Sequence, residues 1–307
     1  MLQKIQSEIQ ELCELYKQEI IQSKKNSLIN ILNNKASQAE YENSLKALTE
    51  VLTSHYKIPC IVLIDDYDIP IMTAYFKNYH IQATDFFGNM LGAVLKDNDL
   101  NIKKALITGT FRILGGNMLS GLNNVNVITI LENTLSSSCG FTNKETLNLL
   151  NYYNIEDELK QKVMEWFGDY IIANKRIVNP FSVLNFVKNR QFKLYLIDSF
   201  SNNLLFYFLQ HSQDFLSNFE KLLHNKPIDI EINKHLILRN EEIKYKDNLF
   251  SLLLFGGYLK CKEKYIVQND NGMKYHHCIV IPTNIESQML FQRVMKLSQI
   301  QRLDMDE

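Results

Sequence analysis

One apolar run that ends in a group of acids constrains the fold of this chain more than any other feature. Residues 60–64 read CIVLI, and Asp65, Asp66, Tyr67 and Asp68 follow them. A short apolar run without polar alternation predicts a strand that is buried on both faces, as in a parallel sheet. Ligands of such sheets bind at the carboxyl ends of the strands. The run therefore predicts an α/β fold with carboxylates at its binding edge.

The segments that follow this strand have the order expected of a βαβ unit. Phe86–Leu95 has a helical pattern, Ala105–Thr108 reads as a second strand, and Val125–Leu131 is a candidate for a third. Strand, helix and strand at this spacing indicate a right-handed parallel crossover. The first half of the chain is therefore predicted to be α/β.

The amino-terminal segment predicts an amphipathic helix over residues 2–32. We expect its apolar face to pack on the body of the same chain, with a two-helix self-association seam as the alternative. The side chains of this face recur at spacings of three and four residues, and they are Leu2, Ile5, Ile9, Leu12, Tyr16 and Ile20.

The second half is predicted to be mostly helical and then to form a winged-helix-like unit. Helical patterns cover 143–153, 157–166 and 180–188, and two alternating runs near the end flank Asn271-Gly272, a strong hairpin signal. The predicted organisation is an amphipathic helical segment at 1–40, an α/β core at 41–175, and a helical and winged-helix-like domain at 176–307.

Composition excludes several classes of function. The chain has 33 Lys and Arg against 34 Asp and Glu, so a net charge of -1 gives no general attraction for nucleic acid or anionic membranes. No apolar run reaches the roughly 18–20 residues of a membrane helix. The charged start is not a secretory signal. We expect a cytoplasmic protein, or an effector that is secreted without such a signal.

The five cysteines are predicted to be reduced. They are odd in number, scattered and without CxxC spacing. If Asn271-Gly272 formed a two-residue turn, Cys261 would lie opposite Pro282, several residues from Cys278. His276 and Cys278 would then supply only two ligands, which argues against a zinc site.

The acidic cluster is the sharpest candidate site. Four apolar residues followed by Asp65 and Asp66 form a Walker B pattern, in which carboxylates hold Mg²⁺ and orient an attacking water. Thr108, at the end of the neighbouring strand, is a candidate sensor of a phosphate, and Arg112 is a candidate phosphate contact. A solvated strand end is the competing reading. A DxD phosphatase reading of Asp66 and Asp68 would need a later acidic pair, which we do not find.

A phosphate cradle is missing from the sequence. No GxxxxGK[ST] motif or relaxed form of it occurs in the chain. Such a loop supplies the backbone amides and the lysine that hold β- and γ-phosphates.

Taken together, the motifs make this chain similar to the AAA-ATPase-like family of bacteria and intracellular parasites, whose members often carry a PD-(D/E)xK nuclease-like domain after the ATPase part. The resemblance runs over roughly residues 41–298. It rests on LIDDYDIPI, LITGTFRI, MLSGLNNV, WFGDY, NPFSVLNF and LFSLLLFGGYL.

The resemblance implies a truncated P-loop NTPase-like sheet, because three family features are absent or changed. Residues 1–40 do not contain the family's strand and RRFGKS-type phosphate loop, and Asp66 stands where the family usually has Glu. The nuclease-like domain is not found before Glu307. Loss of the phosphate-loop strand would leave an open or rearranged sheet, and open edges recruit partners.

The sequence thus supports two hypotheses. The first is a degenerate, non-catalytic AAA-ATPase-like protein that binds a protein partner or self-associates and needs no cofactor, with nucleic-acid binding through the winged-helix-like region as a lesser possibility. The alternative is an ATPase that binds Mg²⁺ and ATP through Asp65 and Asp66.

Overall fold

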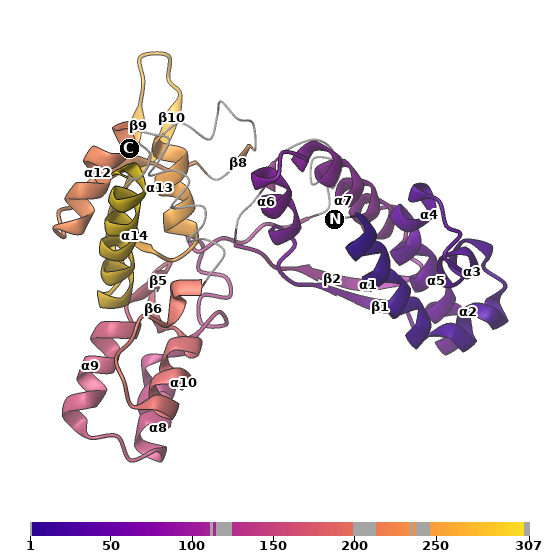
Figure 1. Cartoon of the computed structure of the whole chain (residues 1–307), viewed down its shortest axis with the longest axis horizontal. Helices are drawn as coiled ribbons and strands as arrows, with labels where there is room; N and C mark the ends of the chain where they lie inside the picture. The colour runs from indigo at the N-terminus through magenta and orange to yellow at the C-terminus, as the bar shows by residue number, and fades with distance from the viewer. Residues whose placement is uncertain are drawn as a thin grey trace. The chain divides into compact units, whose positions relative to one another are not determined.

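The computed structural model describes residues 2–110, 113–114, 125–198, 213–233, 236–237 and 246–303 (Figure 1). The chain has a mixed α/β composition and divides into two compact units. The first comprises residues 1–125 and 237–239, and the second comprises residues 126–236 and 240–307. We call them the amino-terminal unit and the carboxy-terminal unit, and each is described by itself.

The amino-terminal unit begins with short helices instead of one long helix over residues 2–32. Lys24 has a positive φ of 55° and ends the second helix, and Asn34 has a φ of 56° shortly after the third. These left-handed residues stop the helical hydrogen-bond pattern. The helices of this unit are α1 (Leu2–Leu15), α2 (Lys17–Ser23), α3 (Asn26–Leu32), α4 (Gln38–Glu42), α5 (Ser44–Tyr56), α6 (Ile69–Phe76) and α7 (His80–Leu95).

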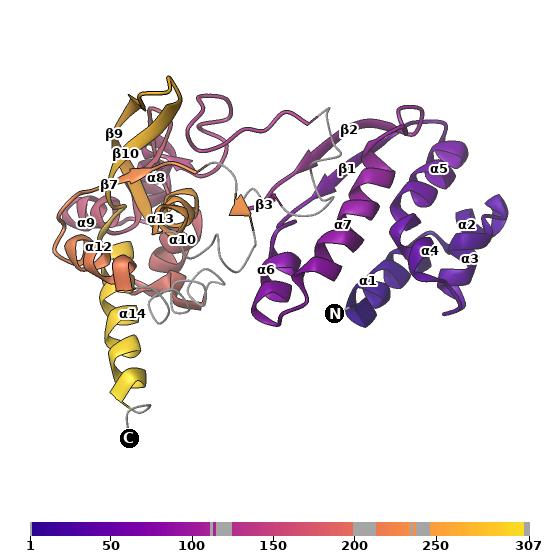
Figure 2. The ribbon, with the colours of Figure 1, turned by 90° about the horizontal axis from the view of Figure 1, so that it is seen from above.

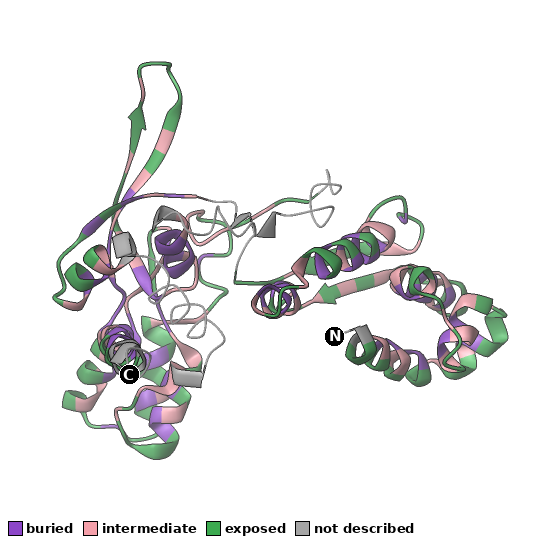
Figure 3. Ribbon diagram, turned by 45° about the horizontal axis from the view of Figure 1, so that its top comes forward, coloured by how far each residue is buried: buried purple, intermediate pink, exposed green. Residues whose placement is uncertain are grey.

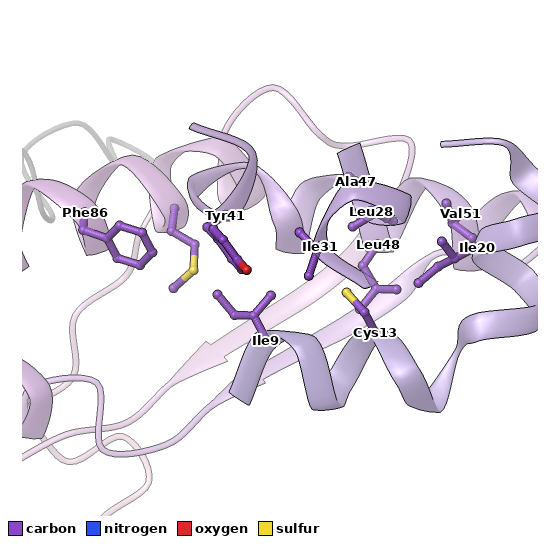
Figure 4. Close-up of a cluster of buried hydrophobic side chains, with 11 residues drawn as sticks. Ile9, Cys13, Ile20, Leu28, Ile31, Tyr41, Ala47, Leu48, Val51 and Phe86 are labelled. Carbon is purple, nitrogen blue, oxygen red and sulfur yellow. The ribbon is translucent and has the colours of Figure 1, made fainter. Parts of the chain in front are cut away.

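The apolar face of the first helices packs on the chain itself, as the spacing predicts. Ile9 and Cys13 on α1 and Ile20 on α2 are buried in one cluster with side chains of α3, α4, α5 and α7 (Figure 4). Leu12 and Tyr16 pack against this cluster and are half-buried. The side chains of Leu2 and Ile5 lie outside the described residues. The cluster gives the helices of this unit a shared core.

The predicted βαβ unit is present as a parallel pair of strands. β1 (Cys60–Ile64) pairs with β2 (Ile102–Ile107), from Cys60 opposite Ile102 to Ile64 opposite Ile107. Helices α5 and α7 lie along this pair (Figures 1 and 2), and α6 and α7 form the crossover between the two strands. Within the described residues this sheet has only these two strands.

The prediction that β1 is buried on both faces is wrong. Alternate side chains of β1 are half-buried and exposed, and Ile61 and Leu63 are 61% and 72% exposed. On β2, Leu106 is 53% exposed and pairs with Leu63. We call Ile61, Leu63, Lys104 and Leu106 the open face, because the register places them on one side of the pair.

Burial differs sharply between two neighbouring residues of α2, which gives a matched test of the helical core. Ile20 is fully buried, whereas Ile21 is 54% exposed. We expect Ile20→Ala to lower the free energy of unfolding by about 2–5 kcal/mol, because it leaves a cavity. Ile21→Ala should change it by less than about 0.5 kcal/mol. Urea unfolding of the full chain measures both, and equal effects would contradict this packing.

The carboxy-terminal unit begins with a small antiparallel sheet between helices. Its strands β4 (Phe141–Thr142), β5 (Tyr170–Ile172) and β6 (Lys175–Val178) have the order β4-β6-β5. The sequence did not predict this sheet, and the strand predicted at residues 125–131 is wrong, since that segment is irregular and ends in a turn. The helical elements here are α8 (Asn143–Tyr152), α9 (Asp157–Phe167), α10 (Pro180–Asn189) and the 3₁₀-helix η1 (Tyr195–Asp198).

The rest of this unit contains a three-stranded antiparallel sheet. Strand β10 lies between β7 and β9, and the outer half of the β9–β10 hairpin is largely exposed (Figure 3). A helix covers residues 213–223, and residues 199–212 lie outside the described residues. The elements are α12 (Gln213–Leu223), β7 (Ile228–Glu231), α13 (Lys246–Phe255), β9 (Leu259–Gln268), β10 (Lys274–Pro282) and α14 (Ile285–Leu303). Two short strands complete the assignment: β3 (Ile113–Leu114), which belongs to the amino-terminal unit, and β8 (Leu236–Ile237).

The predicted hairpin at Asn271-Gly272 is confirmed, but its turn is longer than two residues. Asn269 donates its N–H to the Met273 carbonyl at 3.0 Å, and Gly272 donates to the Asn269 carbonyl at 2.9 Å. Gly272 has a φ of 77°. A type I turn followed by a left-handed glycine has this pattern. The longer turn moves the pairing of the two strands by one residue.

The prediction that all cysteines are reduced is wrong for two of them. Cys261 and Cys278 form a disulfide with their Cα atoms 5.9 Å apart, while Cys13, Cys60 and Cys139 are free. The longer turn and a bulge beside Ile279 place Cys261 opposite Val280 instead of Pro282. Cys261 then lies two residues from Cys278 along the ladder, within reach of a cross-strand bond.

A buried carboxylate ties three helical elements of the carboxy-terminal unit together. Glu286, in the first turn of α14, is fully buried. It accepts hydrogen bonds from Ser182 Oγ of α10 at 2.8 Å and from the N–H groups of Tyr195 and Leu196 in η1 at 2.7 and 3.2 Å. Burial raises the pKa of Glu286, although these hydrogen bonds act in the opposite direction.

Removal of this carboxylate should be costly. We expect Glu286→Ala to lower the free energy of unfolding by more than about 2 kcal/mol, because one buried donor and two partly buried donors lose their acceptor. Glu286→Gln keeps one acceptor oxygen and should cost less. Because the folded state of the parent protein binds the Glu286 proton more tightly, its stability should fall relative to Glu286→Gln as the pH rises from about 4.3. Chemical unfolding at several pH values measures this slope, and its absence would contradict the raised pKa.

Candidate functional site

The structure brings two of the predicted site residues together at the carboxyl ends of β1 and β2. The Thr108 N–H donates to the Ile64 carbonyl at 2.8 Å, and the Tyr67 N–H donates to the Thr108 carbonyl at 3.1 Å. These two hydrogen bonds extend the parallel pairing past the last residues of β1 and β2. They place the Thr108 hydroxyl beside Asp65, and Thr108 Oγ1 donates a hydrogen bond to Asp65 Oδ1.

Asp66 lies next to this pair in a sharp turn. Its φ is 51°, in the left-handed region, and its N–H donates to Asp65 Oδ1 at 3.1 Å. The side chains of Asp65 and Asp66 are both exposed. The same Asp65 oxygen therefore accepts hydrogen bonds from Thr108 and from the Asp66 backbone, which leaves Oδ2 and the Asp66 carboxylate facing water.

Asp68 is the residue of this cluster that differs most from the prediction. It is only 2% exposed and directly precedes α6, and its Oδ1 accepts the Thr110 N–H at 3.3 Å. Gly109 packs so closely that an added Cβ would lie 2.6 Å from Asp68 Oδ1 and from the Tyr67 ring. The sequence indicated Asp68 only as the second acid of a DxD motif. Because Asp68 is buried, it packs against the residues that follow β2 and does not face solvent as Asp65 and Asp66 do.

The chemical capacity of this site is limited to what exposed carboxylates and one hydroxyl provide. Two carboxylates can hold Mg²⁺ through bridging waters, but no group of three His, Cys, Asp or Glu side chains that could hold a metal ion occurs in the part of the chain that the structure describes. Arg112, the predicted phosphate contact, lies outside the described residues. The Mg²⁺ site at Asp65 and Asp66 therefore stays a prediction.

Comparison with known proteins confirms the family resemblance for the first part of the chain. Residues 1–118 match the family described as "Predicted AAA-ATPase", so this part of the chain is similar to that family. The match includes β1, β2 and the carboxylates between them. It also begins at residue 1, so the helical residues 1–40 lie within the matched region.

A curated relative matches a longer part of the chain. It is described as "Uncharacterized protein in vnfD 5'region" from Azotobacter chroococcum mcd 1, and it is 23% identical over 164 residues. These residues make up 53% of this chain and 31% of the relative, so the match spans about a third of the relative's length. No solved structure matches the chain. None of the described helices is long and apolar enough to cross a membrane.

A magnesium titration tests the carboxylates at the strand ends. We expect Mg²⁺ to leave the melting temperature of the parent protein unchanged, because exposed carboxylates that bind the ion only through water gain little from it. The double variant Asp65→Asn, Asp66→Asn should give the same flat response. A rise in melting temperature with Mg²⁺ that the double variant loses would contradict this expectation and favour the ATPase alternative.

Proposed function

We propose that this chain is a degenerate AAA-ATPase-like protein that acts without catalysis, by binding another protein through the open face of β1 and β2. The observation that carries the proposal is the exposure of Ile61, Leu63 and Leu106 on one side of a parallel pair. Parallel strands are normally covered on both faces. Contiguous exposed apolar side chains that are bordered by polar residues are a feature of protein–protein interaction sites.

The chemistry of the strand ends supports a binding role over hydrolysis. The sequence of 307 residues contains no phosphate-loop motif, and Asp66 is one methylene shorter than the Glu that the family resemblance leads us to expect there. Asp66 is also exposed, so an attacking water there would not be shielded from bulk solvent. The alternative is an ATP-binding or ATP-hydrolysing protein that uses Asp65 and Asp66, with the phosphate cradle supplied from elsewhere.

Features of the carboxy-terminal unit favour a protein partner over nucleic acid. The order α12, β7, α13, β9, β10 and the strand order β7-β10-β9 are consistent with a winged-helix-like unit. In such units a helix enters the major groove. Here residues 249–254 of α13 are all buried, so this stretch presents no exposed side to a groove.

The proposal is tested by placing a photocrosslinking amino acid at position 63 of the open face and at the control position 81. Ile81 on α7 is 65% exposed, close to the 72% of Leu63. We expect a discrete protein adduct in cells at position 63 and none at position 81. A second substitution on the same face, Ile61→Lys, should abolish the adduct without lowering the melting temperature, because Ile61 is already 61% exposed.

Titration of the purified chain with ATP and Mg²⁺ distinguishes the proposed partner-binding function from the alternative, an ATP-binding protein. We expect no saturable binding in the micromolar range. Saturable binding that Asp65→Asn weakens, together with the absence of an adduct at position 63, would contradict the proposed function.

A further inference from the structure

A cleft of about 700 Å³ lies within the carboxy-terminal unit, where α9, β6, β9 and the start of α14 meet. This volume is within the range of small-molecule sites in proteins. Charged and amide side chains line the cleft, and the charged ones are Glu165, Asp169, Arg176, Lys260 and Lys262.

Positive charge gathers around one carboxylate of this cleft. Arg176 Nη1 lies 3.2 Å from Asp169 Oδ1, and Lys260 Nζ forms an ion pair with Asp169 Oδ2. Lys260 also donates to the Thr283 carbonyl at 2.7 Å, which fixes its ammonium group. Two cations thus share one anion, and one positive charge remains unneutralised at this point.

Lys262 supplies a second positive charge through a bulge in β9. Glu263 pairs with Ile279 and Cys261 pairs with Val280, so Lys262 is an extra residue without a partner on β10. Bulges direct a side chain away from the regular alternation and are frequent beside binding sites. The Lys262 ammonium has no hydrogen bond or ion pair to any residue that the structure describes, and the side chain lines the cleft.

The cleft also offers hydrogen-bonding groups that are not used by the described parts of the chain. The side-chain amides of Asn143, Asn225 and Gln288 line it and have no partner among the described residues. The remaining carboxylate, Glu165, accepts the Gln161 amide at 3.1 Å. The three cations and two carboxylates of the cleft leave a net charge of +1 beside uncharged amides, which suits an anion that also carries hydroxyl groups.

The loop that carries Asp169 is held in place by its own packing. Asp169 has a φ of 66°, and a Cβ on the preceding Gly168 would lie 2.5 Å from the Met164 carbonyl. The Gly168 carbonyl accepts the Asn284 side-chain amide at 2.9 Å. A residue fixed in the left-handed region by its surroundings is typical of sites whose geometry is set before the ligand arrives.

We propose that this cleft binds a small phosphorylated, hydroxyl-rich compound of the sugar-phosphate class. Its phosphate would lie between Arg176 and Lys262, since a phosphate monoester is close to a dianion at neutral pH. Its hydroxyl groups would reach the amides of Asn143, Asn225 and Gln288. The inference concerns the carboxy-terminal unit alone and is independent of partner binding at the open face.

Calorimetric titration of the full chain with ribose 5-phosphate tests this site, with ribose and inorganic phosphate as separate probes. We expect saturable binding of ribose 5-phosphate, weaker binding of inorganic phosphate, and none of ribose. Lys262→Gln should weaken the binding of ribose 5-phosphate by about tenfold or more, because a charge-assisted contact is lost. Lys274→Gln is the matched control, since Lys274 is an exposed lysine of β10 in the same hairpin and does not line the cleft.

Three results would overturn the proposal. The first is no saturable binding of ribose 5-phosphate up to about 10 mM, the weak end of specific recognition. The second is an equal loss of affinity in Lys262→Gln and Lys274→Gln, which would indicate general charge attraction. The third is equal affinity for inorganic phosphate and ribose 5-phosphate, which would show that the amides contact no part of the ligand. Lys262 is exposed, so its substitution should not impair folding.

Discussion

The amino-terminal unit depends on one constraint: both faces of a parallel pair of strands need to be packed against other segments. Strands β1 and β2 carry apolar side chains on both sides of the pair. Exposure of either side to water is unfavourable, so each side is stabilised when another segment or another molecule covers it. Helices α5 and α7 supply one cover, and the shared core of α1 to α5 and α7 holds those two helices in place. The second side is the open face, so the same constraint that orders the helices also accounts for the proposed partner site.

In the amino-terminal unit, the sequence predicted correctly those features that depend on the pattern within one helix or one strand. The helical spacing of Ile9, Tyr16 and Ile20 correctly predicted which side chains pack inward, and CIVLI correctly predicted a strand. Burial on both faces of that strand was wrong, because it depends on what other segments cover it. The pairing of Asp65 with Thr108 follows from adjacent parallel strand ends, whereas nothing in the sequence separated the buried Asp68 from its exposed neighbours.

In the carboxy-terminal unit, predictions were wrong where they required the register of a hairpin or contacts between distant segments. The sequence between α9 and α10 gave no strand signal, yet β5 and β6 form there and Gly168 and Asp169 shape the loop before them. Gly257, in the GGY sequence before β9, has a φ of 78°, and a Cβ there would lie 3.1 Å from the Tyr170 ring. The motifs WFGDY and LFGGYL thus meet in space. These motifs carry part of the family resemblance, and at this contact their physical role is close packing.

The bulge in β9 determines both whether the Cys261–Cys278 disulfide can form and where the ammonium group of Lys262 lies. Without the bulge, the register beside the turn would place Cys261 opposite Ile281, three residues from Cys278 and on the other side of the sheet. Insertion of Lys262 moves Cys261 opposite Val280, on the side of Cys278, and the disulfide becomes possible. The same insertion removes Lys262 from the ladder and frees its ammonium group for the cleft. The disulfide therefore holds in place the register that gives the cleft its unpaired cation.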